Sequence, residues 1–311
     1  MSPVLFLMKP HMKSSSLAML GLILAMLIWG SSFIAFKIVL EFYPPMFIVA
    51  ARMGIASLVF ILIWRLWYGK WDYREGDWKI FLVMAACEPC LYFLFEAWAL
   101  KFTTASEAGV MTSMLPMLVA IMAGLMLSEK IGLYYWVGLV ISMPGVIWLS
   151  LSGEPGEQAS NPMLGNFLEL CAMVVAAVYT VALRFLSSRY STWLLTSIQA
   201  FAGFVFFLPL FLIFEFQPFV FHFDAMVLIL YLGSIVTLVA YGLYNHGIKV
   251  LSASQATIFT NLIPVFTLIL AFVILGERIS FEQYMAVVMI MAGVLISQVK
   301  EKAPDIPVET F

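Results

Sequence analysis

Long runs of apolar residues follow one another along the chain, with little alternation of apolar and polar positions inside them. Each run is close to the length of about 20 residues that a helix needs to cross the hydrocarbon of a bilayer. Strands of a transmembrane barrel alternate apolar and polar over about ten residues, and these runs do not. The pattern predicts an all-α integral membrane protein with ten transmembrane helices. The expected spans are residues 17–36, 46–66, 78–100, 107–127, 132–151, 164–186, 192–214, 225–248, 253–275 and 281–299.

Composition agrees with this prediction and narrows the class of protein. Of the 311 residues, 63% are hydrophobic and 11% are charged, whereas soluble domains contain about 45–50% apolar and about 25% charged residues. So few charges could not cover a soluble globule, which excludes a soluble enzyme. The net charge of −2 gives no attraction to nucleic acid. Three cysteines in apolar stretches cannot form the disulfide framework of a small secreted protein. We therefore expect the lipid bilayer, not nucleic acid, as a partner.

The linkers between the runs are short, and the longest one is rich in Gly, Pro, Ser and Glu. It divides the chain into two halves of five runs each. The predicted organisation is an N-terminal tail at 1–16, a first five-helix repeat at 17–151, a linker at 152–163, a second five-helix repeat at 164–299 and a C-terminal tail at 300–311.

The two halves resemble each other in sequence. Residues 99–150 align without a gap on residues 247–298, which places Pro116 on Pro264 and Gly145 on Gly293. Because each half has an odd number of spans, the second half enters the membrane upside down relative to the first. Inverted repeats of this kind are common in secondary transporters, where the two halves exchange conformations. The upstream matches are Ser32 with Tyr179, Lys37 with Arg184 and Arg52 with Gln199.

The distribution of Lys and Arg predicts the orientation. With the N-terminus in the cytoplasm, only Lys37, Lys101 and Arg278 fall at outer span ends, and the others outside the spans fall at inner ends or in the tails. Positively charged residues gather on the cytoplasmic side of membrane proteins. We therefore expect both termini in the cytoplasm and the 152–163 linker outside.

Several short motifs resemble those of a known family. Trp29-Gly30-Ser31-Ser32-Phe33, followed by Lys37, Pro44-Pro45 and Arg52, resembles the opening of the EamA branch of the drug/metabolite transporter superfamily. The middle-of-repeat signature of that family has counterparts in both halves: Ala105-Ser106, Pro116 and Glu129-Lys130 in the first, and Ala253-Ser254, Pro264 and Glu277-Arg278 in the second.

The resemblance implies a ten-helix carrier of the inner (plasma) membrane that moves small metabolites, often outward. It also implies a central cavity between the halves, lined by the first, third, fourth, sixth, eighth and ninth spans. Small multidrug exporters of the superfamily carry an essential Glu in the first span. The first span here has none, so their mechanism does not transfer directly.

Ionisable groups inside a membrane span are costly and therefore mark functional candidates. The third span contains Glu88 and Glu96, with Tyr92 between them at helical spacing. One carboxylate can load and release a proton, or bind the ammonium of an amine or amino acid. The alternative is a structural contact with Arg52, Arg184 or a hydroxyl.

Further polar candidates lie in other spans. Tyr241 and Asn245 share a face of the eighth span, Asn261 precedes Pro264 in the ninth, and Pro116 interrupts the fourth. A proline inside a helix frees a backbone carbonyl beside these side chains. Such sites suit a binding cavity, although interhelical hydrogen bonding is the competing interpretation. The remaining candidates for the substrate path are Ser32, Tyr179, Arg52 and Gln199, of which Arg52 either binds a substrate carboxylate or is structural.

Other motifs argue against a cofactor. No nucleotide-binding G-x-x-x-x-G-K loop occurs, and Cys87-Glu88-Pro89-Cys90 lies in a membrane span, outside the usual context of a redox or metal motif. We expect no cofactor and no metal, with proton coupling as one possible energy source. An intramembrane lipid-modifying enzyme is disfavoured because the three His residues are scattered along the chain.

The sequence thus predicts a secondary active or facilitative transporter, not an enzyme. Its expected substrates are small metabolites such as amino acids or amines, and export is the expected direction. The alternatives are a drug or toxic-compound carrier and a nucleotide-sugar-like carrier of the same superfamily. A monomer and a homodimer both remain open.

Overall fold

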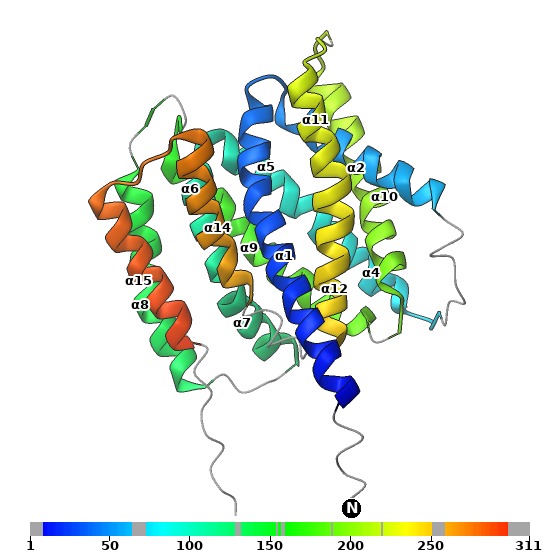
Figure 1. Ribbon diagram of the computed structural model, residues 1–311, viewed down its shortest axis with the longest axis horizontal. Helices are drawn as coiled ribbons and strands as arrows, with labels where there is room; N and C mark the ends of the chain where they lie inside the picture. The colour runs from blue at the N-terminus through cyan, green and yellow to red at the C-terminus, as the bar shows by residue number, and fades with distance from the viewer. Residues whose placement is uncertain are drawn as a thin grey trace, which may run out of the picture.

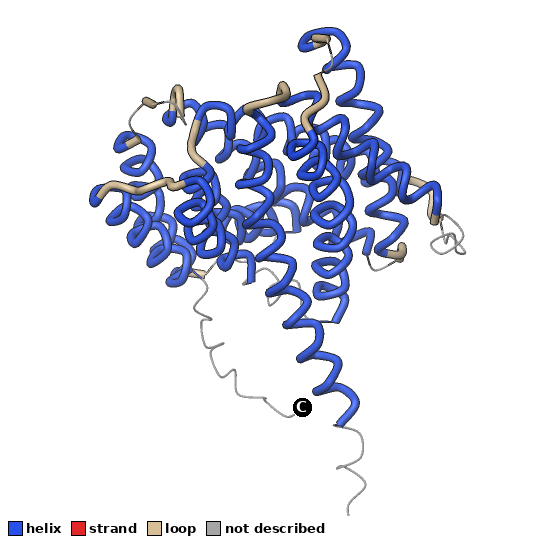
Figure 2. The backbone as a smooth tube through the Cα atoms, turned by 45° about the horizontal axis from the view of Figure 1, so that its top comes forward, coloured by secondary structure: helices blue, strands red, loops and turns tan. Residues whose placement is uncertain are grey.

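The computed structural model describes residues 9–63, 73–127, 132–153, 155–156, 159–187, 189–218, 220–250 and 259–297. Nearly all of this described chain is helix, and its loops lie between helix ends (Figure 2). Its only bridge between extended residues joins Gly156 and Ala159 in the central linker. The prediction of an all-helical protein is therefore confirmed.

The first half contains several helices that are divided by short irregular segments. Its elements are α1 (Lys9–Leu40), α2 (Pro45–Leu62), α4 (Asp77–Ala85), η2 (Ala86–Leu91), α5 (Tyr92–Phe102), α6 (Ala105–Met111), η3 (Thr112–Met114), α7 (Leu115–Leu127) and α8 (Leu133–Ser152).

The second half has the same general order. Its elements are α9 (Pro162–Ser187), α10 (Thr192–Leu210), η4 (Phe211–Glu215), α11 (Phe223–Tyr231), η5 (Leu232–Ala240), α12 (Tyr241–Val250), η6 (Phe259–Asn261), α14 (Leu262–Leu270), η7 (Ala271–Leu275) and α15 (Phe281–Ser297).

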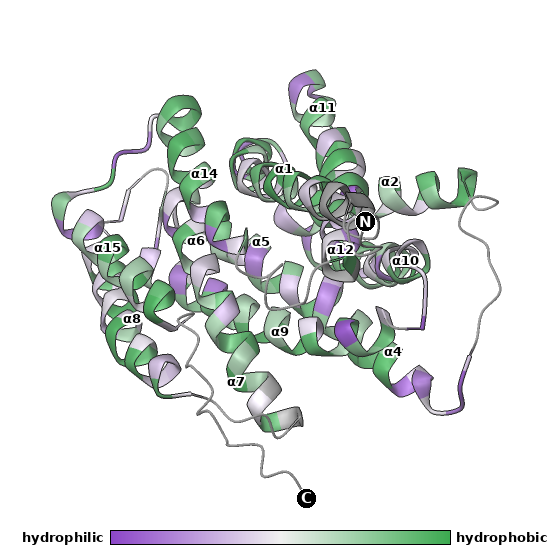
Figure 3. Ribbon diagram, turned by 60° about the horizontal axis from the view of Figure 1, so that its bottom comes forward, coloured by the Kyte–Doolittle hydropathy of each residue, from purple (hydrophilic) through white to green (hydrophobic). Residues whose placement is uncertain are grey.

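Eight helical segments of the described chain are long and apolar enough to cross a membrane, and two more are apolar but shorter. The shorter ones are Phe259–Leu275 and Phe281–Ser297. The start of the expected span 253–275 lies outside the described residues. Many large apolar side chains of the described chain are exposed, and hydrophobic residues predominate along the helices (Figure 3). Soluble monomers rarely expose so much contiguous apolar surface, and a lipid environment accounts for it.

Helices from the two halves interleave. α2 packs against α10, α5 against α9, and α1 against both α12 and α14. The main apolar core includes the buried face of α1, which lies between α14 and α12 in Figure 1. α8 and α15 form a closely packed pair at one side. The start of α1 and the end of α15 lie at the same end of the bundle (Figure 1).

Small residues allow the α8–α15 pair to pack closely. A Cβ atom added to Gly138 of α8 would lie 2.4 Å from the carbonyl oxygen of Gly293 on α15. Helices in a membrane associate through such small-residue contacts, because lipid tails are as apolar as the side chains themselves. The apolar core between α8 and α15 is separate from the core around α1.

Candidate functional site

A cavity of about 70 Å³ lies inside the bundle and is lined by residues of both halves. It brings together many of the polar side chains that the sequence singles out. These are Ser32, Arg52, Glu88, Tyr92, Glu96, Tyr179 and Tyr241. Trp29, Phe33, Phe93, Met173, Tyr244 and Ile263 supply much of the apolar and aromatic wall.

Glu88 lies at a kink between α4 and α5. Its backbone leaves the helical region (φ −137°, ψ 115°) before a cis peptide bond to Pro89. A residue before proline is pushed out of the helical region by the proline ring, so the kink follows from the Glu-Pro sequence. The side chain is 6% exposed, and its carboxylate accepts a hydrogen bond from the Tyr241 hydroxyl of α12. The Gln199 amide lies 3.4 Å from the Glu88 carbonyl oxygen.

Glu96 lies two helical turns farther along the same wall of the cavity. It is buried, and its Oε1 accepts a hydrogen bond of 2.7 Å from the Tyr92 hydroxyl. Tyr92 and Glu96 are one helical turn apart on α5, so the local helix sets this contact. Both carboxylates accept hydrogen bonds from hydroxyl groups, which is one of the structural contacts expected from the sequence. The donor is Tyr241 for Glu88 and Tyr92 for Glu96.

Arg52 brings a positive charge to the same cavity. It is 3% exposed, and its Nε donates a hydrogen bond of 3.0 Å to the Thr237 hydroxyl of η5. Its guanidinium lies 4.3 Å from the centre of the Phe93 ring. Its charge acts on both Glu88 and Glu96, yet within the described residues it forms no ion pair with either carboxylate. The cavity therefore contains charges of both signs without a closed salt bridge.

Aromatic rings also line the cavity. The Trp29 ring lies 5.2 Å from Tyr241 and 5.0 Å from Tyr244, measured between centroids. The Tyr179 hydroxyl is buried beside the Gln199 side chain and has no hydrogen-bond partner among the described residues. Such rings can stack on a planar ligand or face a cation.

Other predicted residues lie outside the cavity lining. Gln199 contacts the back of the Glu88 kink, and Asn245 donates to the Thr196 hydroxyl at 3.3 Å. Asn261 is buried, and its side-chain amide makes no hydrogen bond in the described chain. Pro116 and Pro264 are the second and third residues of α7 and α14, each helix following a 3₁₀ turn.

Glu169 of α9 is not among the site residues predicted from the sequence. This residue is completely buried, and neither carboxylate oxygen has a hydrogen-bond partner in the described chain. It interacts electrostatically with Glu96 across the α5–α9 contact. The signal was present, because Glu169 is an ionisable residue inside the apolar run 164–186. The rule that selects Glu88 and Glu96 selects it as well.

A second polar group that the sequence analysis did not single out joins the two halves where α5 ends and α6 begins. Glu107 of α6 accepts hydrogen bonds from Asn166 of α9 at 2.5 Å and from Gln283 of α15 at 2.8 Å. The Thr103 hydroxyl lies 3.0 Å from the Glu107 carboxylate. A surface pocket of about 660 Å³ is lined by Glu107, Glu277 and Gln283 among others.

Glu277 bonds a helix of the opposite half of the chain. Its place before α15 predicts a contact with the N-terminus of that next helix. Instead, its two carboxylate oxygens accept hydrogen bonds from the backbone N–H groups of Ala105 at 3.0 Å and Ser106 at 2.8 Å. Those groups begin α6, in the other half of the chain. The repeat partner Glu129 lies outside the described residues.

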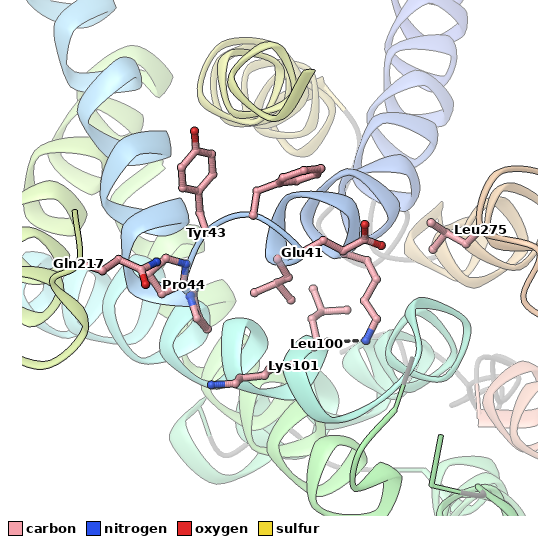
Figure 4. Close-up of a pocket in the computed structure, with 11 residues that line it drawn as sticks. Glu41, Tyr43, Pro44, Leu100, Lys101, Gln217 and Leu275 are labelled. Atoms are coloured by element: carbon pink, nitrogen blue, oxygen red, sulfur yellow. Dashed lines mark hydrogen bonds between the residues drawn. The ribbon is translucent and has the colours of Figure 1, made fainter. Parts of the chain in front are cut away.

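Lys37 of α1 bonds the end of a neighbouring helix. A lysine at a span end is expected to extend toward the interface, but its Nζ donates to the carbonyl oxygens of Leu100 at 2.7 Å and Thr103 at 2.6 Å. It thereby satisfies carbonyls at the C-terminal end of α5, where a cation is favoured. Figure 4 shows this contact beside a pocket of about 560 Å³, which Glu41, Tyr43 and Gln217 also line. That pocket is larger than the central cavity, and its charged lining residues are Lys37, Glu41 and Lys101.

Comparison with known proteins places both halves in one family. The model of the EamA-like transporter family matches residues 16–151 and again residues 163–298. The chain belongs to the EamA-like transporter family.

Curated relatives of this EamA-like protein carry transporter names. "Uncharacterized transporter YetK" of Bacillus subtilis (strain 168) is 30% identical over 294 residues, covering 93% of this chain and 88% of its own length. "Uncharacterized transporter YcxC" of the same organism is 30% identical over 305 residues, covering 93% of this chain and 96% of its own. An "Uncharacterized transporter" of Archaeoglobus fulgidus is 28% identical over 282 residues, covering 90% of this chain and 96% of its own length.

A solved structure supports the fold of the EamA-like chain. It is described as "Crystal structure of protein", and it superposes with a TM-score of 0.65 at 19% sequence identity. The match covers 91% of this chain and 97% of the solved chain. At this identity the likeness supports the helical architecture alone. Family, relatives and apolar helices together show a multi-pass membrane protein of a transporter family.

Proposed function

We propose that this EamA-like protein is a secondary transporter that exports small metabolites bearing an ammonium group, such as amino acids and amines. The observation that carries the proposal is the central cavity, in which Glu88, Glu96 and Arg52 are buried together between the two repeats. Membrane-buried charges of both signs beside a cavity are costly unless they serve a ligand or a structural pair. In the described chain, Arg52 forms no such pair with the two carboxylates.

The chemistry of the cavity suits a zwitterion or an amine. Glu88 presents a carboxylate that bonds an ammonium well, and the nearby aromatic rings of Trp29 and Tyr241 add cation–π attraction. The Arg52 guanidinium offers a fork of N–H groups that matches a substrate carboxylate. A nucleotide sugar would need more cationic groups for its two phosphates than the single Arg52 of this lining supplies.

We further propose that the protein has ten transmembrane helices in two inverted five-helix halves. It lies in the inner (plasma) membrane, and both termini are in the cytoplasm. The repeat alignment and the Lys and Arg distribution support this arrangement. In this scheme the halves rock against each other around the cavity, and the outer contacts of Glu277 and Glu107 separate when the cavity opens outward. Because the cavity lies within one chain, a monomer suffices for transport.

The test is counterflow in liposomes that contain the full chain. Vesicles are preloaded with unlabelled solute, and uptake of radiolabelled amino acids, amines and nucleotide sugars is compared across the panel. We expect accumulation of at least one amine or amino acid, lost in Glu88→Gln and retained in Glu75→Gln, which removes an exposed carboxylate before α4. Accumulation of nucleotide sugars alone, or of no solute, would contradict the proposal.

A further inference from the structure

Glu169 occupies a distinctive place on α9. Asn166, Glu169, Met173 and Ala176 are spaced three, four and three residues apart, so they share one face of the helix. Met173 and Ala176 line the central cavity. Glu169 therefore lies on the cavity-facing side of α9, one turn closer to its outer end. It is completely buried, and neither carboxylate oxygen has a hydrogen-bond donor in the described chain.

The charge that acts on Glu169 in the described chain is the Glu96 carboxylate, and Lys101 at the far end of α5 lies over the Trp98 ring. From α5 it faces Glu96, whose carboxylate is bonded to the Tyr92 hydroxyl. From α6 the titratable group is Glu107, and from η2 it is Glu88 together with Cys87 and Cys90. The helices α7 and α10 and the turn η3 pack on α9 and carry no titratable side chain.

The remaining titratable groups lie toward the opposite end of α9 or in other contacts. From α4 they are Asp77, which is paired with Arg189, and Lys79, which lies near the Trp78 ring. From α8 they are Tyr134 and Tyr135 in its first turn, and on α9 itself they are Cys171, Tyr179 and Arg184. The field at Glu169 thus comes chiefly from the Glu96 carboxylate.

A line of polar side chains leads from the outer surface to this position. Glu107 lines the outer pocket of about 660 Å³ and is bonded to Asn166. Asn166 precedes Glu169 by one turn on the same face of α9. Glu169 in turn faces Glu96, which lines the central cavity. The buried carboxylate therefore lies between the outer pocket and the cavity.

We propose that Glu169 and Glu96 form a proton-binding site, separate from the Glu88–Tyr241 contact that we assign to substrate. Arg52 acts on Glu96 without forming an ion pair with it in the described chain, and Glu169 has no hydrogen-bond donor there. Desolvation and mutual repulsion therefore oppose a state in which both buried carboxylates are charged. Binding one proton converts one carboxylate to a carboxylic acid, which can then donate a hydrogen bond to the other. The proton-binding site itself does not depend on the proposed transport function. Its role does rest on that function: it couples proton entry from the outer pocket to substrate export.

Infrared difference spectroscopy on the purified full chain tests the site without any substrate. Spectra recorded over a series of pH values show the carbonyl stretch of each protonated carboxylic acid. A buried acid keeps this band at pH values where exposed carboxylic acids have ionised. We expect Glu169→Gln and Glu96→Gln each to remove this persistent band. Glu169→Asp should retain it with a shifted midpoint, and Glu75→Gln should leave it unchanged. An unchanged band in Glu169→Gln would overturn the proposal.

Two further measurements cover a variant that does not fold and a site that binds sodium instead of a proton. If Glu169→Gln does not purify as a folded protein, loss of the band in Glu96→Gln with a shifted midpoint in Glu169→Asp supports the site, and an unchanged band in both overturns it. Replacing choline chloride with sodium chloride at constant pH should leave the band unchanged. A loss specific to sodium would assign the site to that ion and contradict proton binding.

Transport measurements keep this proposal distinct from the proposed function. In liposomes, Glu169→Gln should retain counterflow and lose the stimulation of transport by a proton gradient. A band that titrates as expected in a protein that transports no solute would support the proton site and contradict the transport proposal. Full stimulation by a proton gradient in Glu169→Gln would contradict the coupling role.

Discussion

The hydroxyl of Tyr241 donates a hydrogen bond to the carboxylate of Glu88, linking the two halves of the protein at the central cavity. Glu88 lies at the kink of the third apolar segment, and Tyr241 begins α12 in the second half. The contact places a charged group where both halves can act on it together. A substrate ammonium that binds Glu88 therefore meets groups from both repeats.

Substitution of Glu88 is expected to affect amine binding more strongly than substitution of its partner. Glu88→Gln removes the charge, and Tyr241→Phe removes only one neutral donor. Hydrogen bonds to charged groups contribute about 1.5–3 kcal/mol, which corresponds to a rise in KM of about 10–100-fold. For Tyr241→Phe we expect a smaller rise, because the Glu88 carboxylate that binds the ammonium remains in place. Counterflow at a series of amine concentrations measures both. Equal effects of the two substitutions would contradict a charge-based role for Glu88.

Arg52→Gln separates the two ends of a zwitterionic substrate. If the guanidinium binds the substrate carboxylate, KM for an amino acid should rise by about 10–100-fold, since a charged hydrogen bond is lost. KM for the matching amine, which lacks the carboxylate, should change by less than about threefold, roughly 0.6 kcal/mol. Competition of each ligand against one labelled substrate gives both values. An equal loss for the amino acid and the amine would assign Arg52 a structural role through Thr237 and Phe93.

Glu277→Ala should loosen the outer contact between the halves. The carboxylate satisfies the N–H groups of Ala105 and Ser106 at the start of α6, and the loss of such a helix cap costs about 0.5–2 kcal/mol. Hydrogen exchange at these two amides should therefore become faster. Glu282→Ala, in the exposed first turn of α15, provides the matched control. Unchanged exchange at residues 105 and 106 would show that this contact does not hold the halves together.

Gly138→Val should separate α8 from α15. A Cβ atom at Gly138 would lie 2.4 Å from the Gly293 carbonyl oxygen, and overpacking of this kind costs about 1–3 kcal/mol. We expect a lower midpoint of thermal unfolding in detergent. Gly242→Ala on α12 is the control, because a Cβ there meets no atom within 4 Å. A midpoint for Gly138→Val that equals the control would exclude close packing of α8 on α15.

The apolar runs alone determine that the chain forms membrane helices, because a bilayer leaves backbone polar groups no partner except one another. The order of these runs and the matches of Pro116 with Pro264 and Gly145 with Gly293 also determine the division into two related halves. Helical spacing predicts the Tyr92–Glu96 contact, since both residues lie on one helix one turn apart. These features depend on local geometry and on the surrounding solvent.

Partners across helices were decided only by the tertiary structure. Helical spacing cannot show that Tyr241, and not Arg52, bonds Glu88, because the two candidates come from different helices. Glu277 contacts the helix of the opposite half, which no nearest-neighbour rule predicts. Glu169 is visible in the sequence as a charge in an apolar run. Its burial beside Glu96, without a hydrogen-bond donor, depends on how α9 rotates against α5, and that rotation is set by the packing of the whole bundle.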